Sequence, residues 1–183
     1  MSFQNTAGDL RGAPGKSRLR RGAAGPFLRP QLAIALYRAT GAIIAIAAME
    51  LLASLAREPL ARVPFVTSVV LVMALPASEA ARTRAILGGH LLSSLAGWFI
   101  LTFAGQAESA SALAVGLATF VMIATKTLHP PAGIDAFLIT SQGLPASWIV
   151  SPVLTGALLL AVYAAVWTAG ERRLAAIFRG QSG

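Results

Sequence analysis

The sequence contains no cysteine and few charged residues. Without cysteine the chain forms no disulfide and offers no thiolate ligand to a metal ion. Only 12% of the 183 residues are charged and 56% are hydrophobic, whereas a soluble domain averages about 25% charged residues. This composition disfavours a soluble globular domain and indicates a membrane protein.

The motifs of soluble enzymes are also missing. The sequence has no phosphate-binding loop, no G-x-S-x-G elbow, and no H-x-x-x-H or E-x-x-H spacing for a metal. An intramembrane hydrolase would need a serine beside a histidine base, and nothing in the sequence places Ser93 or Ser94 against His129. The sequence therefore predicts a protein that is not an enzyme and that has neither a cofactor nor a metal site.

The basic charge gathers at the two ends of the chain. Residues 1–38 contain seven Lys/Arg against Asp9 alone, and residues 170–183 contain three Arg against Glu171. Basic ends could indicate nucleic-acid binding, but the tail has little aromatic interleaving and no recognisable fold motif. The positive-inside rule is the simpler interpretation. It predicts a protein of the bacterial inner (plasma) membrane with both termini cytoplasmic, no nucleic-acid partner, and a basic tail able to bind anionic lipid.

Apolar runs of two lengths follow the tail. Residues 1–30 are rich in Gly, Ala, Arg and Ser without apolar periodicity, which predicts a disordered basic tail. A helix that crosses the bilayer needs about 20 residues. Four runs come close to or exceed that length: 31–56, 86–104, 110–128 and 147–169. Two others, 63–75 and 132–144, begin beside prolines and would reach only about 20 Å.

The two short runs end in the same tetrapeptide. Leu-Pro-Ala-Ser occurs at 75–78 and at 144–147, each time between a short run and a long one. The order long, short, long therefore occurs twice, over residues 31–104 and 110–169, and a basic C-terminus follows at 170–183. Three crossings per copy would make the copies inverted, as in many transporters. We expect an all-α polytopic membrane bundle of two inverted repeats; the rival interpretation makes the short segments re-entrant.

A polar segment, TKTLHPPAGIDAF, interrupts the apolar pattern at residues 125–137. Pro130 and Pro131 suit the first turn of a helix, and Gly133 allows a ligand to approach the backbone. The free N–H groups at this helix start, those of Ala132, Gly133 and Ile134, would point into the membrane and favour an anion. The structural alternative is that the two prolines only separate one helix from the next.

Other polar residues lie near this segment or on neighbouring runs. Lys126 and His129 would add positive charge beside the anion, although Lys126 could equally extend to the membrane interface. His90 lies next to a stripe of small residues, Gly89, Ser93 and Gly97, that allows close helix packing. A polar residue in the bilayer is costly and is a functional candidate by default.

Two carboxylates lie within apolar runs and need an explanation. Asp135 follows the double proline, and Glu50 lies within the first long run. Each is expensive in the bilayer unless it is protonated, paired or facing water. When the two repeats are aligned, Ser68 and Asp135 take equivalent positions, so we expect them to face each other near the midplane.

Three stretches resemble the HPP family of integral membrane proteins. They are Leu-His-Pro-Pro-Ala-Gly at 128–133, Leu-Gly-Gly-His-Leu-Leu-Ser at 87–93 and Ala-Leu-Pro-Ala-Ser at 74–78, and the resemblance covers about residues 39–170. It implies a small helical membrane protein with four or more spans. Plant-plastid and cyanobacterial members are implicated in nitrite transport. The resemblance singles out His90, His129, Pro130, Pro131 and Gly133.

The sequence departs from the family pattern at two places. Val-Thr-Ser-Val at 66–69 replaces a Gly-Ala-Ser-Ala-like stretch, and Ile-Asp-Ala at 134–136 replaces Ala-Thr-Ala. The second change puts the carboxylate of Asp135 where a hydroxyl is expected, so the transported ion need not be nitrite.

Three functional hypotheses follow from these features. The first is a transporter or channel for a small inorganic anion, nitrite-like, bound between the N-termini of the short helices. The second is a proton- or cation-coupled permease that uses Asp135 and Glu50. The third is a non-transporting membrane scaffold with a lipid-binding tail. The lipid bilayer is the expected partner in every case, and a homo-oligomer stays open.

Overall fold

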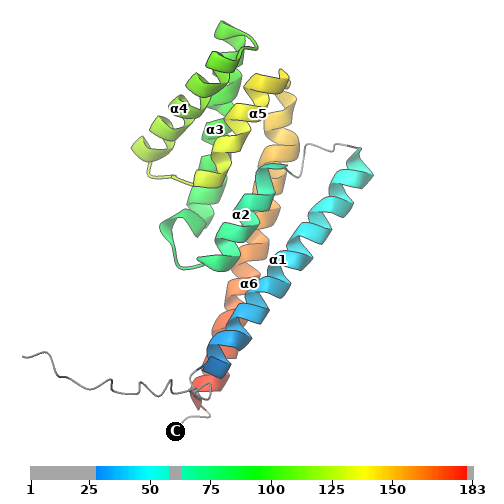
Figure 1. The fold of residues 1–183 in the computed structure, drawn as a ribbon, viewed down its shortest axis with the longest axis vertical. Coiled ribbons are helices and arrows are strands. Elements are labelled where there is room, and N and C mark those ends of the chain that lie inside the picture. Colours follow the sequence, from blue (N-terminus) through cyan, green and yellow to red (C-terminus); the bar gives the residue numbers. More distant parts are fainter. Residues whose placement is uncertain (1–27, 58–62, 181–183) are drawn as a thin grey trace, which may run out of the picture.

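The computed structural model describes residues 28–57 and 63–180, and in that part of the chain it contains helices and no strand. The six α-helices, connected by short 3₁₀ and π-helical segments, form one bundle (Figure 1). Their bounds are α1 (Leu28–Ala56), α2 (Val63–Ala74), α3 (Thr83–Ala104), α4 (Glu108–Ala124), α5 (Gly133–Gln142) and α6 (Thr155–Gly180). The short segments are η2 (Glu79–Ala81), η3 (Pro130–Ala132) and η4 (Ile149–Leu154). The all-helical fold is confirmed.

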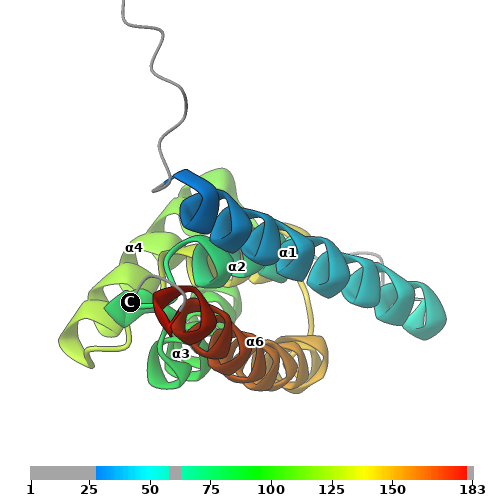
Figure 2. The same ribbon diagram turned by 90° about the horizontal axis from the view of Figure 1, so that it is seen from below.

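Consecutive helices run in alternating directions (Figure 1). α3, α4 and α5 pack closely on one another, and α1 packs on α2 and α6. Seen from below, α1 and α6 lie at the side of the bundle and α1 extends away from it (Figure 2). α5 packs along α3, whereas α2 packs on α1 and α6 and reaches α3 through the contact of Ser68 with His90. Ser68, in the second turn of α2, and Asp135, in the first turn of α5, therefore both lie beside His90.

Both short segments form where the sequence predicts them. α2 covers 12 residues and α5 covers 10, and each is followed by its Leu-Pro-Ala-Ser copy. Each copy contains a turn closed by a bond between residues three apart, but the two turns are offset by one position. The N–H of Ser78, the last residue of the first copy, donates to Leu75 O at 3.0 Å, whereas the N–H of Trp148, just after the second copy, donates to Pro145 O at 2.9 Å. The inverted relation between the two halves stays a prediction.

α4 is shorter than predicted. The run 110–128 was expected to be one helix, but α4 ends at Ala124. The N–H of Thr127 donates to Met122 O at 2.9 Å and that of Lys126 to Ile123 O at 3.1 Å, with Lys126 in the left-handed conformation at φ 56°. These two bonds form a Schellman motif, which terminates a helix by satisfying its last carbonyls.

The last long run is interrupted near its start. The run 147–169 was expected to be one regular helix, but η4 precedes α6 and Ser151 has extended backbone angles, φ −135° and ψ 120°. Pro152 explains the break because proline lacks an N–H and pushes the preceding residue out of the α region. α6 itself continues to Gly180, so most of the predicted basic C-terminus at 170–183 is helical.

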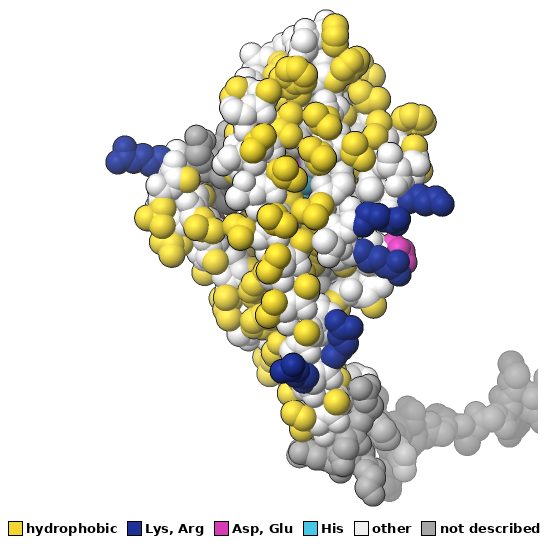
Figure 3. Space-filling view, turned by 180° about the vertical axis from the view of Figure 1, so that it is seen from behind, with side chains coloured by type: hydrophobic (Ala, Val, Ile, Leu, Met, Phe, Trp, Pro, Cys, Tyr) yellow, Lys and Arg dark blue, Asp and Glu magenta, His cyan; other side chains and the backbone are white. Residues whose placement is uncertain are grey.

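Among the described residues, three helical segments are long and apolar enough to cross a membrane: Gln31–Ala56, Thr83–Ala104 and Ile149–Ile177. α2 and α4 are shorter apolar helices. Hydrophobic side chains cover much of the surface in Figure 3, with basic side chains confined to a few places. Large exposed residues such as Leu55 (73%), Phe103 (75%) and Phe120 (69%) fit a surface that contacts lipid. Most of the predicted tail, residues 1–27, lies outside the described residues.

α3 and α5 approach each other closely because Gly97 lies between them. A Cβ added at Gly97 would be 2.7 Å from Ala136 Cα and 2.8 Å from Ala136 O. The hydroxyl of Thr140 crosses the same contact and donates to Gly97 O at 3.1 Å. Small residues are common at membrane-helix contacts because they let backbones come together.

An ion pair connects α1 and α6 and also contacts the end of α2. Arg38 of α1 donates to both carboxylate oxygens of Glu171 on α6, at 2.8 and 2.7 Å, and to Ala74 O at the end of α2, at 3.0 Å. Its side chain is 31% exposed and that of Glu171 is 15% exposed. A bidentate pair of this kind restricts the relative positions of α1 and α6.

Gly97→Ala should destabilise the bundle by about 1–3 kcal/mol, because the new methyl group meets backbone that cannot move aside. Gly116→Ala on α4 is the matched control, since a Cβ there meets nothing within 4 Å. Thermal unfolding of the purified protein in detergent should show a lower midpoint for the first variant and an unchanged or higher one for the second. Equal midpoints would show that the α3–α5 contact does not depend on Gly97.

A double-mutant cycle on Arg38 and Glu171 should give a coupling energy of about 1–2 kcal/mol, because the pair is bidentate and partly buried. The Glu79–Arg82 pair is the control, with side chains 72% and 62% exposed. Its coupling should be no more than about 0.5 kcal/mol. The cycles use Gln substitutions and unfolding free energies at one salt concentration; similar coupling in both pairs would contradict this assignment.

Candidate functional site

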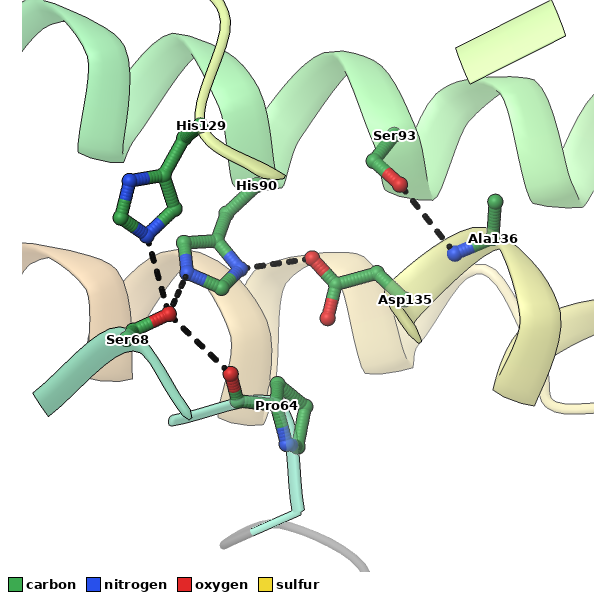
Figure 4. A network of polar contacts seen from close by, with 7 residues as sticks. All are labelled: Pro64, Ser68, His90, Ser93, His129, Asp135 and Ala136. Atoms are coloured by element: carbon green, nitrogen blue, oxygen red, sulfur yellow. Dashed lines mark hydrogen bonds and ion pairs between the residues drawn. The ribbon is translucent and has the colours of Figure 1, made fainter. Parts of the chain in front are cut away.

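Four polar side chains are completely buried where the two short helices meet α3. They are Ser68 on α2, His90 on α3, His129 just before η3, and Asp135 on α5, and each is 0% exposed. We call these four residues the polar tetrad. The sequence singles out all four, and the structure brings them into one hydrogen-bonded group (Figure 4).

The tetrad is a continuous chain of short contacts. Asp135 Oδ2 lies 2.7 Å from His90 Nδ1, and His90 Nε2 lies 3.1 Å from Ser68 Oγ. Ser68 Oγ lies 2.9 Å from His129 Nε2, and His129 Nδ1 lies 2.6 Å from the backbone oxygen of Ala80 in η2. The chain therefore extends from the first turn of α5 to the η2 turn.

Ser68 is the central member of the tetrad. Its hydroxyl contacts both imidazoles and also lies 3.2 Å from Pro64 O, one turn earlier in α2 (Figure 4). A hydroxyl carries one proton and two acceptor lone pairs. Ser68 can therefore donate to only one of Pro64 O and the two imidazoles at a time. It can accept only from an imidazole N–H, because the carbonyl oxygen of Pro64 has no proton to give.

Glycines on α3 let the tetrad assemble. A Cβ at Gly89 would lie 2.6 Å from His129 Cβ, and one at Gly88 would lie 2.6 Å from Thr127 Cγ2. The segment before η3 can therefore lie against α3 only because these positions have no side chain. One turn further along α3, Ser93 Oγ accepts from the N–H of Ala136 at 3.3 Å and fixes the start of α5.

Phe65 forms a wall beside the tetrad. Its ring centroid lies 4.9 Å from that of His90. The same ring lines an apolar cavity of about 430 Å³ between α1 and α6. Ser151 and Pro152, where the helix is interrupted, also line this cavity. Phe65 thus separates His90 from the cavity.

Two buried oxygens near this site have no hydrogen-bond partner among the described residues. They are Asp135 Oδ1 and Ser94 Oγ. An unpaired oxygen is particularly costly for an ionised carboxylate in an apolar interior.

The predicted anion site at the N-terminus of the second short helix needs a correction. The sequence predicts free N–H groups at Ala132, Gly133 and Ile134. The N–H of Ala132 donates to His129 O at 2.9 Å, and that of Gly133 is bonded to the carbonyls of Pro130 and Pro131. The 3₁₀ turn η3 therefore occupies two of the three expected donors. Gly133 still has open space beside it, because a Cβ there would meet nothing within 4 Å.

Four other predicted residues lie outside the tetrad. Lys126 is exposed because it occupies the left-handed position at the end of α4, and it does not join His129 as expected. Pro130 is exposed and Pro131 is half-buried, so these prolines shape η3 without contacting the other polar groups. Glu50 is exposed on α1 and is not part of the tetrad.

The backbone oxygens of Ala80 and Pro64 were missed by sequence reasoning. Neither residue has a polar side chain, so no residue-type signal marks them. Ala80 follows the first Leu-Pro-Ala-Ser copy by two residues, and Pro64 precedes Ser68 by four, the spacing of a helical turn. Only the second spacing could have suggested a contact.

The tetrad leaves little room for metal binding or nucleophilic catalysis in this conformation. Both ring nitrogens of His90 and of His129 already have protein partners, so neither imidazole presents a free lone pair to a metal. Ser68, His90 and Asp135 follow the order of a catalytic triad. However, Ser68 is completely buried and contacts two imidazoles, so a substrate carbonyl cannot approach its hydroxyl.

Comparisons with known proteins place the chain in a family. The family described as "HPP, transmembrane region" matches residues 28–174. Two transmembrane proteins of Dictyostelium discoideum are 37% and 36% identical to the chain over 111 residues. These alignments cover 56% of the chain but only 39% and 35% of the relatives, so the chain spans less than half of their length. No solved structure matches the chain significantly.

The family match includes every member of the polar tetrad and all three candidate membrane spans except the last three residues of the third. The resemblance found in the three sequence stretches is therefore confirmed over most of the chain. The chain belongs to the HPP family of transmembrane proteins.

Proposed function

We propose that the protein transports a small inorganic anion of the nitrite type across the membrane together with a proton. The polar tetrad carries this proposal, because it is a completely buried group of two imidazoles, a carboxyl and a hydroxyl inside an apolar helical bundle. Polar groups at such a position are expensive and usually mark an ion or proton pathway.

Proton binding gives the tetrad a way to attract and release an anion. With one proton shared between His90 and Asp135, and with His129 neutral, the group has no net charge. A second proton would make the net charge +1. In an apolar interior that charge attracts an anion far more strongly than it would in water. Loss of the proton removes the attraction, so the anion and the proton move together.

The surroundings support a small substrate. Ser68, His90 and His129 are 0% exposed. The space beside them is therefore too small for a large organic anion. The open space at Gly133 lies four residues after His129 and two before Asp135. An ion of a few atoms at this place would lie beside Gly133, a residue that is close in sequence to both His129 and Asp135. The resemblance to family members implicated in nitrite transport supports the same class of ion.

Nitrite uptake into proteoliposomes tests the proposal. Uptake should be saturable and should rise when the outside is made more acidic than the inside, because the proton moves with the anion. It should fall when a protonophore removes the gradient. Empty liposomes under the same gradient measure leakage of the undissociated acid. Competition by nitrate, chloride and formate would define the selectivity.

His129→Gln should lower this uptake by at least about tenfold, in line with the loss of a positioned proton-transfer group. Lys126→Gln is the matched control, because Lys126 lies three residues away and is exposed. It should retain uptake near that of the unmodified protein. Uptake no greater than that of empty liposomes at every pH gradient would refute the proposed function. Equal losses in both variants would refute the assignment of His129 to the site.

A further inference from the structure

The hydrogen bonds of the polar tetrad have a direction that can be worked out from the acceptor at one end. His129 Nδ1 faces Ala80 O, and a carbonyl oxygen only accepts, so Nδ1 must carry the proton. When His129 is neutral, its Nε2 is therefore an acceptor. The hydroxyl of Ser68 donates to that nitrogen across 2.9 Å.

The direction continues through the other two members. Because the proton of Ser68 is used at His129, Ser68 Oγ accepts from His90 Nε2–H across 3.1 Å. Neutral His90 then has an unprotonated Nδ1, which must accept from Asp135 Oδ2–H across 2.7 Å. Every proton in the chain points from Asp135 toward Ala80.

The unpartnered oxygen of Asp135 supports this neutral arrangement over an ion pair. If His90 were charged and Asp135 ionised, Oδ1 would share the negative charge without a single donor among the described residues. In the neutral form Oδ1 is an ordinary carbonyl oxygen, and leaving it unpaired is much less costly. The geometry therefore favours a protonated Asp135 at the start of the chain.

We propose that the polar tetrad is a proton wire between the first turn of α5 and the η2 turn, and that the Ser68 hydroxyl is its switch. The wire deepens the proposed function by assigning the path of the coupled proton. It rests on that function only for the identity of the accompanying ion, because proton transfer along the tetrad needs no substrate.

Transfer along the wire requires three proton hops. Asp135 gives its proton to His90 Nδ1, His90 gives its Nε2 proton to Ser68 Oγ, and Ser68 gives its original proton to His129 Nε2. The products are an ionised Asp135 and a doubly protonated His129, with one proton moved and no covalent bond between heavy atoms changed. His129 then releases its Nδ1 proton on the side of η2, when the contact with Ala80 opens.

The backbone oxygen of Pro64 explains how the hydroxyl of Ser68 can be reset. The transfer also leaves His90 as the Nδ1–H tautomer and His129, once it has lost its Nδ1 proton, as the Nε2–H tautomer, so both imidazoles must exchange tautomers before the next transfer. After one transfer the hydroxyl of Ser68 points at His90, and it must turn before the next proton can pass. Pro64 O lies 3.2 Å from Ser68 Oγ, within hydrogen-bond distance. The hydroxyl can therefore turn away from one imidazole while it donates to Pro64, so it never loses a partner inside the bundle.

The two ends of the wire differ in how close they lie to exposed charged groups. On η2, Glu79 and Arg82 pair with each other at 2.6 Å beside Ala80 and are exposed. α2 has no charged residue, and Lys126 is exposed after α4. Among the described side chains, the titratable groups that face Ser68 are His90 and His129. The η2 end is thus close to exposed charge, and the Asp135 end is buried.

Nitrogen NMR of the native protein with ¹⁵N-labelled histidine tests the direction of the wire. At neutral pH we expect His129 as the Nδ1–H tautomer and His90 as the Nε2–H tautomer. Infrared difference spectra against Asp135→Asn should show a protonated-carboxyl C=O band from Asp135. An Nε2–H tautomer at His129, or an ionised Asp135, would overturn the assignment, and neither result depends on the folding of a serine variant.

Ser68→Ala tests the switch in proteoliposomes that contain a pH-sensitive dye. Proton movement driven by an anion gradient should fall by at least about tenfold, because the central donor and acceptor is lost. Ser68→Thr keeps the hydroxyl and should restore much of the movement. Ser94→Ala is the matched control, since Ser94 is a buried serine whose hydroxyl has no hydrogen-bond partner among the described residues.

The results separate the wire from the proposed function. Nitrite uptake with normal proton coupling in Ser68→Ala would overturn the wire and leave the transporter standing. The expected tautomers and a protonated Asp135, together with no nitrite uptake in the unmodified protein, would support the wire and reject nitrite as the coupled ion. If Ser68→Ala fails to fold, Ser68→Thr and the NMR tautomers of the native protein decide.

Discussion

Hydrogen bonding inside an apolar bundle is the constraint on which the rest of this structure depends. Lipid and apolar side chains offer no donors or acceptors, so each buried polar group must find its partner within the protein. The tetrad meets most of this requirement with members from α2, α3, α5 and the segment before η3, and leaves Asp135 Oδ1 without a partner among the described residues. The two short helices are held at the centre largely because Ser68 and Asp135 both reach His90.

The packing of α3 follows from the same requirement. Hydrogen bonds of 2.7 to 3.1 Å between the tetrad side chains require close approach of their backbones, and a larger residue at Gly88, Gly89 or Gly97 would prevent it. The glycines therefore act on the site without contacting any ligand. In this part of the protein the arrangement of apolar surfaces and the arrangement of polar groups cannot be separated.

Much of the fold could be predicted from the sequence. The apolar runs, the prolines before the short segments and the repeated tetrapeptide gave the order of elements, because helix length and proline stereochemistry are local properties. The end of α4 at Ala124 was missed, since a Schellman motif with lysine in the left-handed position has no strong residue signature. The break near Ser151 was signalled by Pro152, but the apolar composition around it suggested a continuous helix.

The residues of the candidate site could be predicted from the sequence, but their arrangement in space could not. Ser68, His90, His129 and Asp135 could be singled out because polar residues are rare in this chain. Their order in space could not be derived, since it depends on how α2 and α5 pack on α3. The expectation of free N–H groups at Ala132 and Gly133 was wrong because the 3₁₀ turn uses those groups. Residue types cannot predict backbone hydrogen-bond partners such as Ala80 O, because every residue has a backbone oxygen.

The apolar cavity beside α1 has a consequence for how the protein is handled. Its walls are mostly apolar, formed by residues such as Leu52, Phe65 and Leu160, and offer few partners to ordered water. In a membrane, the hydrocarbon tail of a neighbouring lipid would fill this space of about 430 Å³. Detergents with short or bulky tails would fill it poorly, so the choice of amphiphile should influence how firmly α1 stays on the bundle during purification.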